Sequence, residues 1–227
     1  MVKWGFDEAT PKMLPTGERI TVVMPAFNEQ ASVGAVVKDF LSLGFVDEII
    51  VADNDSEDGT LKEAEKAGAK VVIEKERGYG SACIRALKEA DADIVVLVES
   101  DGTFAASDLT RMLQELKEAD FVSGSRTSPA YNEVGADMAW YKIAGNRVLG
   151  KLVSMIYGCA PLRDIGSTYV AVRKETLNRF ARKLHIGDSS FSAEMYIAAA
   201  SSGAAMAQIP IGYRARIGRS KLSSGHV

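Results

Sequence analysis

Glu99 and Asp101 stand one residue apart, directly after the apolar, β-branched run from Ile94 to Val98. Such a run indicates a buried strand of a parallel sheet, and alternation along it sends both acids to one side, with Ser100 opposite. In open α/β sheets, ligands bind beyond the carboxyl ends of the strands. Two acids aimed there repel each other unless a proton or cation lies between them. Carboxylate oxygens suit Mg²⁺ or Mn²⁺, and these ions commonly bridge to a diphosphate.

Strand and helix patterns alternate along the whole chain on short connections, which predicts an α/β fold: a single domain with a mostly parallel, doubly wound sheet flanked by helices. Pro210 predicts an edge position for the last strand, and polar residues 127–137 predict a loop. The expected strands cover residues 20–24 (ended by Pro25), 48–52, 70–74, 94–98, 121–124, 169–172 and 208–213. The expected helices cover residues 28–43, 60–67, 81–90, 107–117, 138–157 and 192–201.

Composition excludes several classes of protein. The chain of 227 residues has a net charge of −3 and a pI near 5.6, which gives no electrostatic footprint for nucleic acid. Residues 1–19 lack the apolar stretch of a signal peptide. No stretch approaches the ~18 consecutive apolar residues of a spanning helix. The sequence therefore predicts a cytoplasmic protein, peripheral at the cytosolic face of a membrane at most.

Four segments resemble, in their order and spacing, the motifs of family 2 glycosyltransferases. They are residues 22–29 (VVMPAFNE), 51–60 (VADNDSEDGT), 77–82 (RGYGSA) and 99–101 (ESD). The resemblance implies a GT-A-type fold that moves a sugar, with inversion, from a nucleotide diphosphate sugar. It covers residues 20–222, with a nucleotide-sugar-binding half over 20–124 and an acceptor-binding half over 125–222. Residues 1–19 would be an extension and residues 223–227 a tail.

Within that family, the second half of the chain is similar to polyprenyl-phosphate sugar synthases of the dolichyl-phosphate mannose synthase type. The matching positions are Ser123-Gly124-Ser125-Arg126, Asn146-Arg147, Asp164 with Ser167, Glu194, and the segment 213–222. This resemblance implies a polyprenyl or dolichyl phosphate as the acceptor and GDP or UDP as the donor nucleotide. Two departures from the pattern matter: Glu99 replaces the usual first aspartate of the metal motif, and Asn54-Asp55 replaces the more common Asp-Gly.

The resemblance also implies the residues of the donor site. Asp101, with Glu99 directly or through water, would hold Mg²⁺ or Mn²⁺ and stabilise the leaving diphosphate. The other donor-binding positions would be Pro25, Ala26, Asn28 and Glu29, then Asp53 and Asp55, and the glycine loop with Gly78, Gly80 and Ser81. Asp53 alternatively caps a helix, and the glycine loop alternatively forms an ordinary turn. We expect Arg77 to face solvent.

Arginines and lysines are concentrated near the predicted crevice of an otherwise acidic chain, which indicates an anionic acceptor. The resemblance implies that Arg126 and Arg216 contact the acceptor phosphate and that Ser220 and Lys221 close over the donor diphosphate. Further acceptor-binding positions would be Arg147, Asp164, Ser167 and Glu194. An anionic phosphate oxygen needs no strong general base. A hydroxyl acceptor would need one, and the candidates are Asp164, Asp188 and Glu194.

Other interpretations stay open. The basic segment 214–221 could be a solvated tail. The acceptor could be soluble, or the chain could be a catalytically silent sugar-nucleotide-binding module. A nucleotidyltransferase is disfavoured, because residues 25–28 (PAFN) replace its glycine-rich, lysine-bearing loop. Met138, Trp140, Tyr141 and Ile143 would form either a membrane-facing patch or ordinary core.

Overall fold

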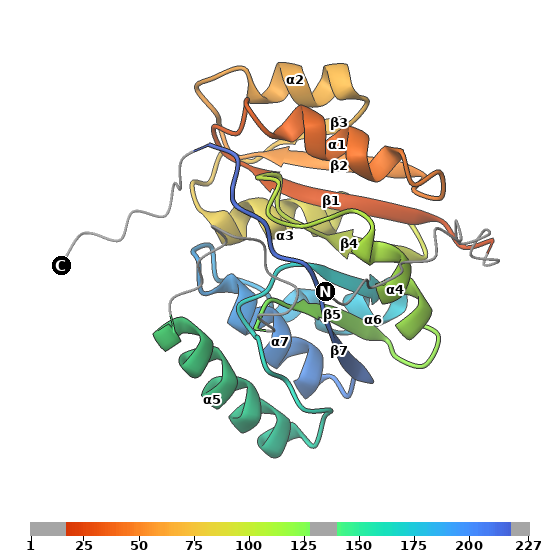
Figure 1. Ribbon diagram of the computed structural model, residues 1–227, viewed down its shortest axis with the longest axis vertical. Helices are drawn as coiled ribbons and strands as arrows, with labels where there is room; N and C mark the ends of the chain where they lie inside the picture. Colours follow the sequence, from red (N-terminus) through yellow and green to blue (C-terminus); the bar gives the residue numbers. More distant parts are fainter. Residues whose placement is uncertain (1–16, 128–139, 219–227) are drawn as a thin grey trace, which may run out of the picture.

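The computed structural model describes residues 17–127 and 140–218, and in these residues seven strands form one sheet (Figure 1). The strands are β1 (Ile20–Ala26), β2 (Glu48–Asp53), β3 (Lys70–Ile73), β4 (Ile94–Leu97), β5 (Phe121–Ser125), β6 (Val170–Arg173) and β7 (Met206–Pro210). Their order is β3-β2-β1-β4-β6-β5-β7. Crossovers between non-adjacent strands make the sheet doubly wound, as the sequence predicts.

Only β6 runs against its neighbours among the described strands, since it pairs antiparallel with both β4 and β5 while every other pair is parallel. The prediction of a mostly parallel sheet is therefore confirmed. The reversal matters for the site. The residues just before β6, Thr168 and Tyr169, arrive at the same edge of the sheet as the residues that follow β4 and β5.

Helices cover both faces of this sheet (Figure 1). They are α1 (Val33–Leu41), α2 (Thr60–Ala67), α3 (Tyr79–Glu89), α4 (Asp108–Glu115), α5 (Trp140–Tyr157), α6 (Lys174–Phe180) and α7 (Phe191–Ser201), with a short 3-10 helix at Ala181–Lys183. Because strand residues alternate, Val22 and Met24 join the core under α1, α2 and α4, whereas Val23 joins the core under α3, α6 and α7. Only Gly150 and Val153 of α5 are buried.

Two expected boundaries in the first half of the chain are wrong, and one helix is absent from the expectation. The first helix begins at Val33 rather than at residue 28, because Asn28 has a left-handed backbone (φ 53°) that no α-helix contains. Strand β1 continues through Pro25, whose missing N–H costs no ladder bond because pairing with β4 ends at Val23. Helix α6 was not expected at all.

The C-terminal strand lies at Met206–Pro210, a few residues earlier than expected, and it forms one edge of the sheet as Pro210 predicts. Within the described ranges, no helix is long and apolar enough to cross a bilayer. The loop expected over residues 127–137 falls almost entirely outside the described residues, as do Met138 and the tail.

Candidate active site

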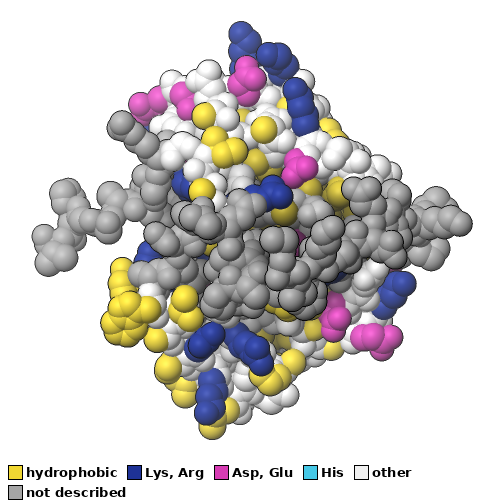
Figure 2. Space-filling view, in the orientation of Figure 1, with side chains coloured by type: hydrophobic (Ala, Val, Ile, Leu, Met, Phe, Trp, Pro, Cys, Tyr) yellow, Lys and Arg dark blue, Asp and Glu magenta, His cyan; other side chains and the backbone are white. Residues whose placement is uncertain are grey.

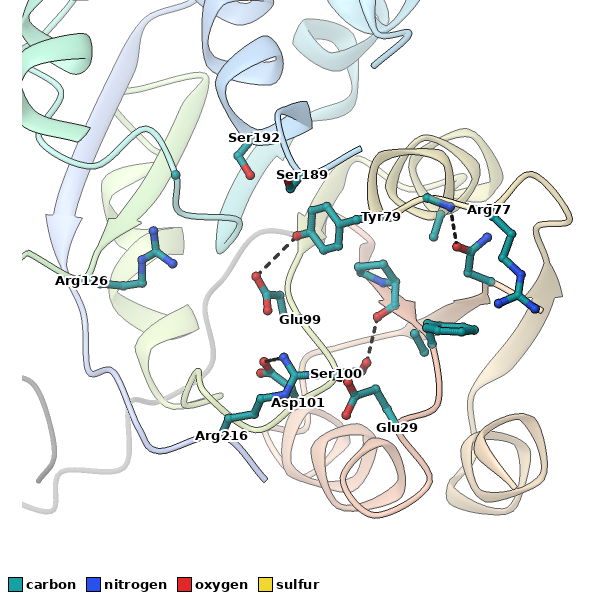
Figure 3. Close-up of a pocket in the computed structure, with 17 residues that line it drawn as sticks. Glu29, Arg77, Tyr79, Glu99, Ser100, Asp101, Arg126, Ser189, Ser192 and Arg216 are labelled. Carbon is teal, nitrogen blue, oxygen red and sulfur yellow. Dashed lines mark hydrogen bonds and ion pairs between the residues drawn. The ribbon is translucent and has the colours of Figure 1, made fainter. Parts of the chain in front are cut away.

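A cavity of about 390 Å³ opens at the carboxyl ends of β1, β2, β4 and β5 (Figure 3). Arg126 and Arg77 lie at its two ends, with the carboxylates between them. The lining residues come from all four motifs, from residues at and just before the start of α7, and from three further positions, Arg126, Gly166 and Arg216. They are Pro25, Ala26, Phe27, Glu29, Asn54, Arg77, Gly78, Tyr79, Ala82, Glu99, Ser100, Asp101, Arg126, Gly166, Ser189, Ser192 and Arg216.

Glu99 and Asp101 both line this cavity, although β4 ends at Leu97 and strict strand alternation no longer applies. Ser100 also lines it, and its hydroxyl donates to the carbonyl of Pro25 at 2.8 Å, which ties the metal motif to β1. Burial, and after it the negative charge of Asp101, together raise the pKa of Glu99 to about 7. The two acids therefore repel each other as the sequence predicts.

Arg216 supplies a positive charge to this carboxylate cluster. Its Nη1 donates to Asp101 Oδ2 at 2.8 Å, and its Nη2 pairs with Glu29. The chain around it lies against the metal motif, because Ile217 N donates to Asp101 O and Arg214 N donates to Thr103 O. The guanidinium thus occupies a position where a cation is electrostatically favoured.

The carboxylate oxygens of the cavity fit a divalent cation that is bound together with a substrate diphosphate. No group of three or more His, Cys, Asp or Glu side chains arranged to hold a metal occurs in the described part of the chain. Mg²⁺ is usually bound by one or two carboxylates plus substrate phosphates and water, which matches the pair Glu99 and Asp101. Asp101 Oδ1 is held by the backbone and hydroxyl of Thr103, at 3.0 and 2.7 Å, so its orientation is fixed.

Two asparagines hold the donor-side loops in place. The Asn54 amide donates to the carbonyls of Glu74 and Glu76, and its oxygen accepts from Gly78 N at 2.8 Å. Asn28 donates through its backbone to Ser56 and accepts from Glu57 N. Asn54, which departs from the usual pattern of the second motif, therefore positions the glycine loop. Asn28 links the first motif to the second and does not itself line the cavity.

From the second motif, Asn54 lines the cavity beside Phe27, whereas the predicted donor-binding residues Asp53 and Asp55 do not line it. Asp53 is buried, and while its Oδ2 accepts from Ser56 N, its Oδ1 has no hydrogen-bond partner in the structure. Arg77 lies over the Phe27 ring, 4.8 Å from its centroid, and pairs with Asp55 and Glu57 at 3.4 Å. Arg77 lines the cavity and also keeps 51% of its side chain exposed, so it faces solvent as we expected and the cavity as well.

The glycine loop approaches protein backbone rather than an open cradle, which corrects the expectation for Gly80 and Ser81. Their N–H groups both donate to Gly187 O, at 2.7 and 3.2 Å. A Cβ at Gly80 would overlap the carbonyl of Ile186, and a Cβ at Gly78 would overlap that of Gly187. Gly78 lines the cavity, but Gly80 and Ser81 do not.

Arg126 supplies a cation at the other end of the cavity from Arg77, directly after β5. Asp164 accepts from its Nε and Nη2, both at 2.9 Å, and from its backbone N at 3.0 Å. Asn146 of α5 donates to the same carboxylate at 3.0 Å. The Arg126 side chain is 12% exposed and the Asp164 side chain is fully buried, so the guanidinium reaches the cavity in a fixed orientation.

Four predicted acceptor-binding residues do not line the cavity. Asp164 holds Arg126, and Ser167 is fully buried. Glu194 accepts from the backbone N–H groups of His185 and Ile186 and so shapes the loop before α7. Arg147 donates to the carbonyl of Thr127, outside the cavity. We therefore correct their role from direct substrate contact to support, while Ser220 and Lys221 lie outside the described residues.

Sequence reasoning missed several residues that shape the cavity. The Tyr79 hydroxyl donates to Glu99 Oε1 at 3.5 Å, and Thr168 Oγ1 donates to the same oxygen at 2.8 Å. Burial, with the nearby Cys83 and then Glu99, raises the pKa of Tyr79. Ser189 and Ser192 enter from the start of α7. Only Tyr79, inside the glycine loop, carried a sequence signal that could have pointed to it.

This fold and its cavity define a GT-A glycosyltransferase domain. The crystal structure of glucosyl-3-phosphoglycerate synthase from Mycobacterium tuberculosis, in complex with Mn²⁺, UDP and glucosyl-3-phosphoglycerate, has a similar fold. The TM-score is 0.66 at 24% identity, covering 90% of this chain and 73% of that one.

The sequence matches Glycosyl transferase family 2 over residues 21–185, and the chain belongs to that family. A dolichyl-phosphate hexose transferase from Haloferax volcanii is 32% identical over 209 residues, which is 91% of this chain and 88% of the relative. Glycosyltransferase AglJ of the same organism is 34% identical over 165 residues, which is 72% of this chain but only 53% of that relative.

Proposed function

We propose that this glycosyltransferase moves a hexose from a nucleotide diphosphate sugar to a polyprenyl phosphate, with the help of Mg²⁺ or Mn²⁺. One observation carries the proposal. A single cavity holds the carboxylate pair Glu99 and Asp101 and, facing them, the fixed guanidinium of Arg126 (Figure 3). The carboxylates match a metal-bound diphosphate, and the guanidinium matches a second anion, the acceptor.

The donor side fits a nucleotide diphosphate. A divalent ion at Asp101 and Glu99 would neutralise the charge that grows on the leaving diphosphate. Arg216, which the resemblance assigns to the acceptor phosphate, pairs with Asp101 and Glu29, so we assign it to the donor instead. It would exchange these carboxylate partners for oxygens of the diphosphate without leaving the cavity.

The acceptor side favours an anion over a neutral hydroxyl. Direct displacement by a hydroxyl needs a carboxylate to take its proton, whereas a phosphate oxygen does not. The candidate bases Asp164, Asp188 and Glu194 do not line the cavity. Of the three described carboxylates that do line it, Glu29 and Asp101 pair with Arg216, and Glu99 is assigned to the metal in this proposal. Arg126 would place the attacking phosphate oxygen and neutralise its charge.

Sequence relatives support the lipid phosphate more than a soluble acceptor. The dolichyl-phosphate hexose transferase aligns over 91% of this chain. A glucosyl-3-phosphoglycerate synthase from Mycolicibacterium paratuberculosis, at 37% identity, aligns over only 43% of this chain and 32% of its own length.

A transfer assay tests the proposal. UDP- and GDP-hexoses would be offered with polyprenyl phosphate, or with 3-phosphoglycerate, in Mn²⁺, Mg²⁺ or EDTA. We expect metal-dependent transfer to polyprenyl phosphate, lost in Asp101→Asn and kept in the control Asp91→Asn, whose side chain is 96% exposed. Transfer to 3-phosphoglycerate alone would refute the acceptor class, and full activity in EDTA would refute the metal site.

A further inference from the structure

Helix α5 presents a row of apolar side chains to solvent. Trp140 is 80% exposed, Met155 70% and Ile156 71%, although large apolar side chains normally lie inside. Figure 2 shows hydrophobic side chains gathered where α5 lies in Figure 1. We call this row the outer face of α5. Its members are Trp140, Tyr141, Val148, Leu149, Leu152, Met155 and Ile156, each at least 42% exposed.

These residues share one side of the helix. Tyr141, Val148, Leu152 and Met155 follow one another at intervals of three, four or seven residues, which places them on one stripe. The opposite side carries the two buried residues of α5, Gly150 and Val153. The outer face is thus a continuous apolar surface rather than a scatter of single exposed residues.

Positive charge borders the outer face. Helix α5 contains Lys142, Arg147 and Lys151 and no acidic residue, in a chain whose net charge is −3. By helical spacing, Arg147 and Lys151 lie on one margin of the outer face and Lys142 on the other. Among the described residues none of the three forms an ion pair with an acid, so their charge is available.

A groove lies along the margin of the outer face that carries Arg147 and Lys151, and a further cation, Arg163, lines it. It has a volume of about 580 Å³, and Arg147, Lys151 and Arg163 line it together with apolar Met155 and Leu162. Cations beside an apolar surface match the chemistry of an anionic lipid, whose phosphate lies at the surface while its chains are buried.

The inner side of α5 is tied to the catalytic cavity. Asn146 donates to Asp164, which in turn holds the Arg126 guanidinium. From the margin of the outer face, Arg147 also donates to the carbonyl of Thr127, one residue after Arg126. A surface on which α5 rests would therefore lie beside the end of the cavity where the acceptor phosphate is proposed to bind.

We propose that the outer face of α5 docks on an anionic lipid bilayer, with its apolar side chains in the interface and Lys142, Arg147 and Lys151 at the level of the phosphates. This inference rests on the proposed function in one respect, that the acceptor is a lipid. A second copy of the chain fits less well. A symmetric contact would bring the cations at the margins of one α5 close to the like charges of the other.

Vesicle flotation tests the docking without donor or acceptor. We expect the protein to bind phosphatidylcholine vesicles that contain phosphatidylglycerol, and to bind pure phosphatidylcholine much more weakly. The double variant Met155→Gln/Ile156→Gln should weaken binding at least about tenfold through lost apolar burial. Ile73→Gln is the matched control, because Ile73 is 51% exposed on β3 at the other edge of the sheet.

The charged margin has its own variants. Lys142→Gln/Lys151→Gln should weaken binding to the anionic vesicles by about fivefold for each cation and reduce its salt dependence. The control Lys62→Gln/Lys88→Gln removes two exposed lysines from α2 and α3 and should change binding less.

Four outcomes decide the inference. Absent vesicle binding, or binding that both α5 variants leave unchanged, overturns it. So does a dimer in light scattering that Met155→Gln/Ile156→Gln dissociates, because the face would then belong to a second copy. Vesicle binding lost in the α5 variants, with transfer to detergent-dispersed polyprenyl phosphate retained, supports it. Vesicle binding by a protein that transfers no sugar also supports the docking and refutes only the proposed function.

Discussion

Replacing Asp164 with asparagine tests whether one buried carboxylate holds the Arg126 guanidinium in place. Asp164 is fully buried and accepts four hydrogen bonds, three from Arg126 and one from Asn146, at 2.9 to 3.0 Å. Asparagine has the same shape but only one acceptor oxygen. Its amide nitrogen would face N–H donors at the other position, so about half of the hydrogen bonds would be lost.

The magnitude follows from burial. A hydrogen bond to a charged group contributes about 1.5–3 kcal/mol, and removing one partner of a buried ion pair costs about 3–5 kcal/mol. Arg126 keeps 12% of its side chain exposed to the cavity, where water relieves part of the uncompensated charge. We therefore expect Asp164→Asn to lower the free energy of unfolding by about 3 kcal/mol.

Urea denaturation of Asp164→Asn, Arg126→Gln and the double variant would measure this. We expect a coupling energy of at least about 2 kcal/mol, since the double variant leaves no unpaired charge. In the transfer assay, Asp164→Asn should raise the KM for the acceptor while donor binding stays unchanged. Additive single effects, or a loss of donor affinity with acceptor KM unchanged, would refute the assignment of Asp164 as the positioning residue for Arg126.

Three further predictions concern the metal motif and the glycine loop. Burial and Asp101 raise the pKa of Glu99 in the folded protein to about 7, so the metal-free protein should lose stability as pH rises from about 4.5 through about 7. Thermal melts should show a melting temperature that falls over this pH range, and the fall should be smaller in Glu99→Gln. Arg216→Gln should tighten Mn²⁺ binding to donor-free protein severalfold in calorimetry, since a competing cation leaves Asp101; unchanged affinity would contradict this. Gly80→Ala should destabilise by at least about 2 kcal/mol in urea, because its Cβ overlaps a backbone oxygen, whereas Gly145→Ala, in open space on α5, should stabilise by roughly 0.5–1 kcal/mol.

The parts of the fold that the sequence predicts are those set by local pattern. Alternating strands and helices predict the sheet, and proline at position 210 predicts its edge. Because parallel strands end at one edge, Asp101 and Arg126 could be placed in one crevice from strand order alone. The resemblance added the glycine loop and Arg216 to that crevice.

The parts that it could not predict depend on neighbours distant in the chain. A glycine that leaves room for a ligand and a glycine that leaves room for neighbouring backbone look alike in a sequence. Only the position of segment 186–187 in the structure shows that Gly80 leaves room for backbone. The roles of Asp164 and Glu194 were equally ambiguous in the sequence. Whether a carboxylate binds substrate, a guanidinium or backbone N–H groups depends on its surroundings in the fold. Asn28 shows the same limit, since a left-handed residue is not visible in a helical pattern.

The reversed direction of β6 has a consequence for altering this enzyme. The excursion between β5 and β6, residues 126–169, leaves the sheet beside the catalytic cavity and returns to it at the same place. It can therefore be exchanged as one cassette, carrying α5 with it, while the strands and loops around the donor keep their pairing. If the proposed function holds, we expect a chimera that imports this excursion from a relative with a different acceptor to change what receives the sugar and to keep the choice of sugar nucleotide.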